Sequence, residues 1–308
     1  MDIRVDRSII TAASKSFGPS LLALLGSLNL NWPGHPPVTI YDLGLDATTL
    51  NILSTHQCKV VKVPPFCNHW RKHFTWKIWC LNDAEAKDIL WIDAGLVVLK
   101  PLDEIFFFIE KNGYFLVPNY ELLEWEASEA SCRGCGVNLE FRKDKLTLAA
   151  TLMGFRKEAL INEILKKALC ISLTEEYMKA TESTHRHDQA IISLLLYKHL
   201  KHVVMSDGVV YLGWRSPHQT HGQKVWAHRR HLLKEDLEYF AYRISAPSIP
   251  YIPKDPNQLE LPRNLANRVY AILRYIVIRR SWFHIRHAIK KIMMKPQPIT
   301  KPYNGVKD

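Results

Sequence analysis

The sequence lacks the features that would anchor the chain in a membrane or carry it out of the cell. It has no apolar run of about 18 residues or more, and residues 1–14 lack the charged head and apolar core of a secretory signal. Six cysteines in 308 residues are too few and too scattered for a disulfide scaffold. These absences predict a cytosolic protein in a reducing compartment.

Acidic residues are scarce in one part of the chain, its C-terminal tail. Residues 259–308 hold eleven Lys and Arg but only two acidic residues, so this tail carries a net charge of +9. The remainder carries only +2 of the total of +11. Because the basic charge is confined to the tail, nucleic-acid binding by the whole chain loses its main support.

Strand-like and helix-like patterns alternate along the first ninety residues of this chain, which is 47% hydrophobic. Short extended segments are predicted at 9–14, 38–42, 59–63 and 89–92. Helical patterns lie between them at 17–28, 46–54 and 75–87, and Asp46 is expected to cap the second helix. The alternation predicts an α/β fold with a Rossmann-like, mostly parallel central sheet flanked by helices.

The stretch 88–106, DILWIDAGLVVLKPLDEIF, is the one around which the chain is organised. Residues 89–92 are typical of a strand buried on both faces, and Asp93 ends it. Ala94 and Gly95 add almost no side chain beyond the carboxylate. Open α/β sheets bind ligands at the carboxyl ends of their strands, so Asp93 is a candidate binding residue. An Asp that caps the next element is the structural alternative.

The second half is predicted to contain further strands, further helices and a tail. Strands are expected at 114–117, 149–155 and 203–206, and helices at 157–169 and 189–200. Residues 119–142 are expected to form a long irregular loop, which in a compact domain is usually functional. It contains Cys132 and Cys135, a single closely spaced pair that would serve zinc or redox chemistry or remain as reduced thiols.

The C-terminal region divides into a linker and a basic tail. Five prolines mark a stiff linker over 246–262, so the folded domain is expected to span 1–245. Residues 263–308 are predicted to form a basic amphipathic helical extension with a kink near 279–281. This extension suits an anionic membrane surface. The alternatives are packing on the folded domain or another subunit, or contact with RNA or DNA.

Six segments of the chain, in their order, resemble a known family. They are TAAS, VTIYDLGL, FTWKIWCL, ILWIDAGLVVLKPLDEIF, MGFRKE and HRHDQAIISLLLYK. Together they resemble GT-A nucleotide-sugar glycosyltransferases, most closely the glycogenin-like group and relatives with a Trp-x-Asp-Ala-Gly segment. The resemblance, over residues 9–198, implies a GT-A fold with a C-terminal helical extension. It also implies sugar transfer from a nucleotide-sugar donor to a glycan or lipid-linked acceptor.

The resemblance also implies a divalent metal. In that family an Asp-x-Asp motif holds Mn or Mg, which neutralises the departing diphosphate. Here the motif is Asp93-Ala94-Gly95, so the second carboxylate is missing. Asp93 then binds the metal with extra waters, or a distant residue completes the site, or protein cations replace the metal. The distant candidates are Asp188, His218 and His221, of which we predict His221 as the second ligand. The candidate cations are Lys15, Arg71 and Lys72.

Further site residues are implied by their match to family positions. Asp188 and Gln189 match an Asp-Gln pair beside the donor sugar and the reacting carbon, and are predicted as catalytic. Cofactor-binding roles are implied for Thr11, Ala12, Lys77, Asp93, Ala94 and Gly95. Four of these residues have a structural alternative: Asp188 would cap the helix 189–200, Lys77 would be solvated, and Thr11 and Ala12 would be buried in a strand.

Taken together, these features predict a cytoplasmic hexosyltransferase, peripheral on the inner face of a membrane, that serves surface glycan synthesis. The alternative is a catalytically silent nucleotide-sugar-binding or scaffold protein, because the second carboxylate is missing. A nucleotidyltransferase is disfavoured, since no glycine-rich, lysine-containing phosphate loop lies near the first predicted strand.

Overall fold

The computed structural model describes residues 6–179, 186–206, 208–211 and 223–228. The chain separates into two units, Met1–Tyr251 and Ile252–Asp308, and all described residues belong to the first. The predicted domain end at 245, the linker 246–262 and the tail 263–308 lie outside the described residues, and so does His221. Within the described part, no helix is long and apolar enough to cross a bilayer.

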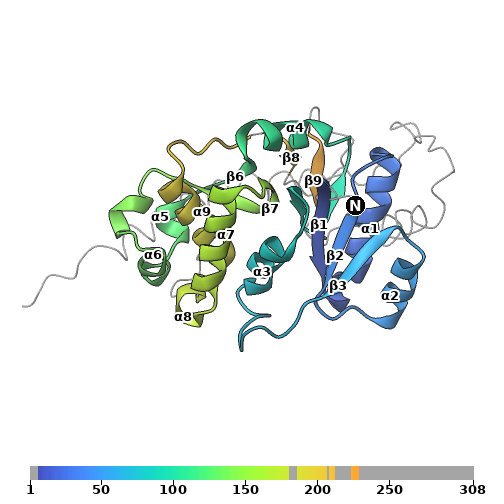
Figure 1. The fold of residues 1–308 in the computed structure, drawn as a ribbon, viewed down its shortest axis with the longest axis horizontal. Helices are drawn as coiled ribbons and strands as arrows, with labels where there is room; N and C mark the ends of the chain where they lie inside the picture. Colours follow the sequence, from blue (N-terminus) through green and yellow to red (C-terminus); the bar gives the residue numbers. More distant parts are fainter. Residues whose placement is uncertain (1–5, 180–185, 207, 212–222, 229–308) are drawn as a thin grey trace, which may run out of the picture. The chain divides into compact units, whose positions relative to one another are not determined.

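A six-stranded sheet forms the centre of the described unit (Figure 1). Its order is β3-β2-β1-β4-β7-β6. The strands are β1 (Arg7–Ala13), β2 (Val38–Asp42), β3 (Cys58–Lys62), β4 (Asp88–Ile92), β6 (Tyr114–Leu122) and β7 (Leu146–Arg156). The first four run parallel, and β7 is antiparallel to both of its neighbours. The predicted mostly parallel α/β fold is confirmed.

Helices cover both faces of this sheet. The longer ones are α1 (Gly18–Asn31), α2 (Ala47–Ser54), α3 (Thr75–Asp83), α4 (Asp103–Asn112), α7 (Ala159–Ser172) and α9 (His187–His199). Helices α3, α7 and α9 pack on the face that carries Ile89 and Trp91, whereas α1 and α4 pack on the face of Leu90 and Ile92. Strand β4 is therefore buried on both faces, as its uninterrupted apolar pattern predicted.

Local sequence signals set several element boundaries. The Asp46 side chain accepts a hydrogen bond from the Thr49 amide at 2.8 Å, which confirms the predicted N-cap of α2. At Gly154 on β7 an added Cβ would lie 2.3 Å from the Ile109 Cδ1 atom, so a larger residue would force the Ile109 side chain of α4 to shift.

Two predictions about the second half are wrong. Residues 119–142 are not an irregular loop, because β6 continues to Leu122 and three short helices follow it. They are α5 (Leu123–Glu126), α6 (Glu129–Cys135) and the 3-10 helix η2 (Leu139–Arg142). Helices this short show too little periodicity to be recognised in the sequence. The predicted strand 203–206 is absent, although the Ser206 amide donates to the Leu116 carbonyl at 2.7 Å.

A smaller sheet lies directly after the central carboxylate. It consists of β5 (Leu96–Val98), β9 (Val225–Ala227) and β8 (Val210–Tyr211) in the order β5-β9-β8. Strand β9 pairs antiparallel with β5, so a segment more than a hundred residues away is fixed beside the turn at Asp93. The remaining short helices are η1 (Lys15–Phe17) and α8 (Glu175–Met178).

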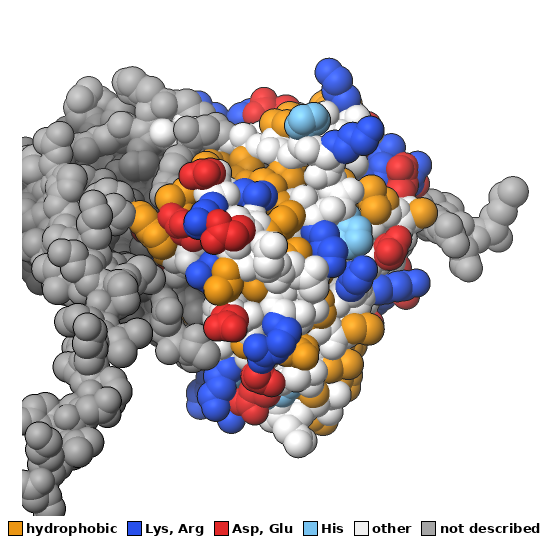
Figure 2. Space-filling model, turned by 90° about the vertical axis from the view of Figure 1, so that its left-hand side faces the viewer, with side chains coloured by type: hydrophobic (Ala, Val, Ile, Leu, Met, Phe, Trp, Pro, Cys, Tyr) orange, Lys and Arg blue, Asp and Glu red, His pale blue; other side chains and the backbone are white. Residues whose placement is uncertain are grey.

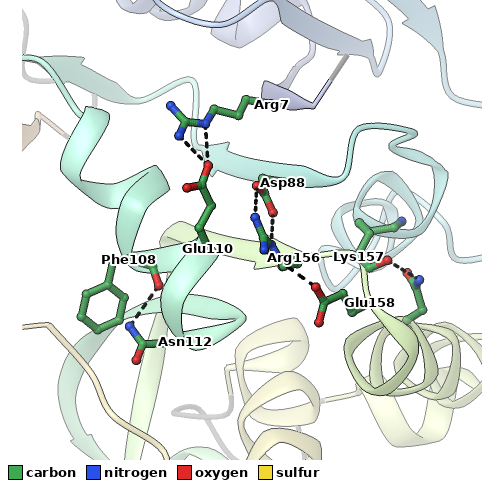
Figure 3. A network of polar contacts seen from close by, with 9 residues as sticks. Arg7, Asp88, Phe108, Glu110, Asn112, Arg156, Lys157 and Glu158 are labelled. Carbon is green, nitrogen blue, oxygen red and sulfur yellow. Dashed lines mark hydrogen bonds and ion pairs between the residues drawn. The ribbon is translucent and has the colours of Figure 1, made fainter. Parts of the chain in front are cut away.

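A separate polar network lies at the edge of the sheet where β1 and β4 begin and the antiparallel β7 ends (Figure 3). Arg156 binds the buried Asp88 through two hydrogen bonds of 2.7 and 2.8 Å, and Arg7 binds Glu110. This network lies at the edge of the sheet opposite to Asp93. On the face shown in Figure 2, the described acidic and basic side chains are interspersed rather than gathered by sign.

Candidate active site

Asp93 lies at the carboxyl edge of the sheet, immediately after β4. The backbone fixes it there, because the Asp93 amide donates to the Thr151 carbonyl of β7 at 2.9 Å. The indole Nε1 of buried Trp91 donates to Asp93 Oδ1 at 2.7 Å. The Asp93 side chain remains 28% exposed. Asp93 therefore presents a partly open carboxylate at the edge where open α/β sheets bind ligands.

Lys77, in the first turn of α3, makes direct contact with this carboxylate. Its ammonium donates to Asp93 Oδ1 at 2.8 Å and to the Ala150 carbonyl at 3.0 Å. The same nitrogen lies 3.8 Å from Asp188 Oδ2, and the Lys77 side chain is only 5% exposed. The predicted alternative of a solvated lysine is therefore wrong. One buried ammonium links two carboxylates that are far apart in the sequence.

Lys77 is held as a cation by its surroundings. Burial lowers its pKa, but attraction to Asp93 and Asp188 outweighs burial, so the pKa is raised overall. The ammonium also lies 5.2 Å from the ring centroid of Trp91 and 5.7 Å from that of Trp76. Aromatic faces stabilise a desolvated cation. These surroundings thus favour the charged form of Lys77 at the base of the site.

Asp188 occupies the first turn of α9 and not its cap. Arg186 is the N-cap residue and Asp188 is buried, so the predicted capping role of Asp188 is wrong. Its Oδ2 atom makes no hydrogen bond and has the Lys77 ammonium 3.8 Å away. Burial raises the pKa of Asp188 to about 6, Lys77 opposes this rise, and Asp93 adds to it. The carboxyl group is therefore poised to exchange a proton near neutral pH.

The stability of the protein should depend on pH through Asp188. Burial raises the pKa of Asp188 from 3.8 to about 6, so its contribution to stability is full below about pH 4 and is lost as the pH rises through 6. Asparagine does not titrate. We therefore expect the free energy of unfolding of wild type, relative to Asp188→Asn, to fall between pH 4 and pH 7. Urea denaturation across this range measures the difference, and a constant difference would contradict the raised pKa.

The other predicted residues are only partly brought together. Gln189 follows Asp188 on α9, and its Oε1 atom is buried without a hydrogen bond. Ala94 is buried in the turn after Asp93. Thr11 and Ala12 are buried in β1, where Thr11 lies opposite Ile40 of β2, and the Thr11 hydroxyl has no hydrogen-bond partner. Among the described residues, Thr11 and Ala12 make no hydrogen bond or ion pair with Lys77, Asp93 or Asp188.

Gly95 is not required by the fold. An added Cβ at this position would meet no atom within 4 Å, and its backbone is outside the left-handed region. A side chain at position 95 is therefore compatible with the structure. The missing second carboxylate reflects the residue type at this position and not a steric limit.

The described residues do not fit a divalent metal. No group of three or more His, Cys, Asp or Glu among them lies close enough to hold an ion. Asp93 Oδ1 already accepts two hydrogen bonds, and the ammonium 2.8 Å from it would repel a second cation. Among the described residues, no second metal ligand therefore lies beside Asp93. The role of His221 as the second ligand stays a prediction.

The two closely spaced cysteines do not form a reactive site. Cys132 and Cys135 are free, buried thiols on α6, and Cys135 is its last residue. Burial raises the pKa of Cys135 to about 12 and also raises that of Cys132. Thiols that stay protonated are poor nucleophiles and poor metal ligands, so these cysteines serve packing.

Sequence reasoning missed two contributors to the site. Trp91 was assigned to the strand core, yet its indole nitrogen orients Asp93. The Ala150 carbonyl of β7 holds Lys77, and no sequence signal could have identified a backbone oxygen. The Trp-x-Asp spacing is a usable signal for Trp91, because side chains two residues apart along a strand point to the same side.

Comparison with known proteins shows the fold. No family model matches the chain, and no curated protein matches it. WbbM, a bifunctional glycosyltransferase solved in its apo form, aligns over 80% of this chain and 50% of its own, with 10% identity and a TM-score of 0.51. An active-site mutant of LgtC aligns over 80% of this chain and 98% of its own, with 13% identity and a TM-score of 0.50. The galactosyltransferase LgtC with donor and acceptor sugar analogs aligns over 80% of this chain and 98% of its own, with 14% identity and a TM-score of 0.49. This chain therefore has the α/β fold found in LgtC and WbbM.

Proposed function

We propose that the protein is a glycosyltransferase that moves a hexose from a nucleotide-sugar donor to a saccharide or lipid-linked acceptor. The observation that carries the proposal is the buried Lys77 ammonium, which joins Asp93 at 2.8 Å and Asp188 at 3.8 Å. This cluster lies at the ligand-binding edge of a fold shared with the glycosyltransferases LgtC and WbbM. A place in the glycogenin-like group and a role in surface glycan synthesis belong to the same proposal.

The cluster can perform the sugar-binding part of this chemistry. Asp93 is open enough to accept a hydrogen bond from a sugar hydroxyl, and Lys77 holds its orientation. Asp188, with a pKa of about 6, can stabilise positive charge at the sugar carbon or take a proton from the acceptor hydroxyl. The buried side-chain oxygens of Thr11 and Gln189 have no hydrogen-bond partner among the described residues.

Protein cations, in this proposal, neutralise the departing diphosphate. The backbone of Lys15 and the guanidinium of Arg71 both lie at the turn around Gly44, which follows the carboxyl end of β2. The Lys15 amide donates to the Gly44 carbonyl at 2.8 Å, and an added Cβ at Gly44 would lie 3.2 Å from the Arg71 guanidinium. Such cations pair with phosphate oxygens through charge-assisted hydrogen bonds. A metal held by Asp93 and His221 is the alternative.

A thermal-shift screen of nucleotide sugars, with and without Mn or Mg, tests the proposal. We expect one nucleotide sugar and its nucleoside diphosphate to raise the melting temperature without added metal. A rise only with metal would favour the Asp93 and His221 alternative. No rise with any nucleotide sugar would contradict the proposed function.

The rival is a catalytically silent scaffold, which the missing second carboxylate favours. Hydrolysis of the donor found in the screen separates it from an enzyme. Wild type should release free sugar and Asp93→Ala should not, whereas a scaffold would show no turnover in either protein.

The Gly95→Asp variant should gain a metal site. The position has room for a side chain, so the variant should fold like wild type. A second carboxylate in the turn after Asp93 would offset the repulsion from Lys77 and supply the oxygen ligands that Mn and Mg prefer. We expect Mn to raise the melting temperature of Gly95→Asp and to leave Gly95→Asn unchanged. An equal response of both variants would show that position 95 does not face the cluster.

The basic tail, 263–308, would bring the enzyme to an anionic membrane that presents the acceptor, at the cytoplasmic face. Each Lys or Arg near the lipid contributes roughly 1 kcal/mol. Sedimentation with anionic vesicles, comparing the full chain with one that ends at Ser245, tests this part. Equal binding would contradict it without affecting the transferase proposal.

A further inference from the structure

An exposed aromatic ring lies beside the Lys77 cluster. Phe74 directly precedes α3, three residues before Lys77, and is 50% exposed. Its ring centroid lies 5.8 Å from the Lys77 ammonium, which in turn binds Asp93. A large apolar surface is therefore held in solvent next to the partly open carboxylate.

The backbone around this ring is strained. Among the described residues, four other than glycine have positive φ, and three of them flank the cluster. His73 and Phe74 both have φ near 56°, and His187, next to Asp188, has φ of 41°. Bulky residues avoid this left-handed region, and such strain persists where the surrounding structure imposes it, often at binding sites.

Neighbouring contacts impose this conformation. The Lys77 amide donates to the Phe74 carbonyl at 2.9 Å, and the Thr75 hydroxyl donates to the Lys72 carbonyl at 2.9 Å. The Phe74 ring lies 6.1 Å from the Trp76 ring and 6.2 Å from the His187 ring. The first turns of α3 and α9 thus hold the exposed ring between two other rings.

We propose that the Phe74 ring is a stacking platform for a pyranose ring of the saccharide acceptor. The inference rests on the proposed function and adds an acceptor subsite to it. A pyranose has an apolar face of C–H groups that covers an aromatic ring, while its hydroxyl groups point outward from the edge. Phe74 offers the apolar surface, and Asp93 offers a hydrogen-bond acceptor nearby.

Exposure favours the acceptor over the donor sugar. Lys77 and Asp188 are buried at the base of the cluster, whereas Phe74 faces solvent. A sugar stacked on Phe74 therefore lies farther out than one that contacts Asp188, as expected for an acceptor that arrives after the donor.

An isolated exposed phenylalanine is common on protein surfaces and needs no function. Phe107 on α4 is such a residue, 59% exposed, with the Arg7 guanidinium 5.2 Å from its ring. Its φ is not positive, and Arg7 belongs to the opposite edge of the sheet. Phe74 differs because its strained backbone holds it beside the cluster, and Phe107 supplies a matched control.

Saturation-transfer NMR on the full chain tests the platform. The probes are methyl β-D-glucopyranoside, methyl β-D-galactopyranoside and methyl N-acetyl-β-D-glucosaminide. We expect at least one to receive saturation at its ring C–H protons. Phe74→Asn should weaken its binding about tenfold, the upper range for one aromatic contact. Phe74→Trp and Phe107→Ala should bind like wild type.

Phe74→Asn also separates function from folding. Asparagine tolerates the left-handed region better than phenylalanine, so this variant should melt at or above the wild-type temperature. Unchanged pyranoside binding in Phe74→Asn, or no pyranoside bound by wild type, would overturn the inference. If Phe74→Asn melts lower, Phe74→Leu keeps an apolar side chain and should still lose binding.

The nucleotide-sugar thermal shift, measured on the same proteins, keeps the two proposals apart. The platform inference predicts an equal shift in wild type and Phe74→Asn. A shift lost only in Phe74→Asn would assign the ring to the donor sugar and overturn the acceptor assignment. A shift absent from wild type would contradict the transferase, whatever the pyranosides show.

Discussion

At about pH 8, where Asp188 is ionised, the Lys77→Met variant is expected to unfold with about 3 to 5 kcal/mol less free energy than wild type, because it leaves the buried Asp188 carboxylate without its cation. Asp188 is 4% exposed and has the Lys77 ammonium 3.8 Å away. Methionine keeps most of the apolar stem, so the loss reports the charge rather than packing. Urea denaturation measures the change, and a loss below about 1 kcal/mol would be typical of an exposed pair instead.

A double variant separates the structural and functional roles of Lys77. Adding Asp188→Asn to Lys77→Met removes the uncompensated buried charge, so most of the lost stability should return. Donor turnover should not return, because Asp93 still lacks the ammonium that orients it. Recovery of both properties would show that Lys77 is only structural.

The Asp93→Asn variant is expected to lower donor turnover about a hundredfold or more, the usual effect of removing one preorganised polar group from an active site. The amide oxygen can still accept hydrogen bonds from Lys77 and Trp91, so the variant should fold. The loss of turnover would have an electrostatic cause, since the partly exposed Asp93 carboxylate becomes a neutral amide. Steady-state donor hydrolysis, with kcat and KM determined separately, measures it.

Glu85→Gln is the matched control for this experiment. Glu85 lies between α3 and β4 with its side chain 83% exposed, so its neutralisation should leave turnover unchanged. A fall in kcat confined to Asp93→Asn assigns the carboxylate to the chemical step. A pure rise in KM would assign it to donor binding. Equal turnover in Asp93→Asn and wild type would remove Asp93 from the active site.

Regular elements were predictable because their signals are local. The apolar run before Asp93 identified a strand buried on both faces, and Asp46 identified the start of α2. The short helices between β6 and β7 were missed, because α5 spans only one turn and its burial depends on contacts far away in the sequence. The strand predicted at 203–206 failed for the same reason, since sheet pairing depends on a partner.

The sequence predicted which residues belong to the candidate site, but it did not predict which of them are in contact. Asp93, Lys77 and Asp188 were predicted from a resemblance in the sequence, yet their spacing does not indicate which of them meet. The structure places Lys77 between the two acids, at 2.8 and 3.8 Å, and thereby changes its role from a solvated lysine to a buried cation. The structure also shows that Arg186, and not Asp188, is the N-cap residue of α9.

The sequence by itself determined the alternation of strands and helices, the carboxylate at the end of β4 and the confinement of basic charge to the tail. Each follows from residue type and short-range spacing, which act before the chain folds. Only the tertiary structure decided that α3, β4 and α9 deliver one ammonium and two carboxylates to a single point. That outcome depends on the helix packing over the sheet, and burial then sets the charges, raising the pKa of Asp188 to about 6.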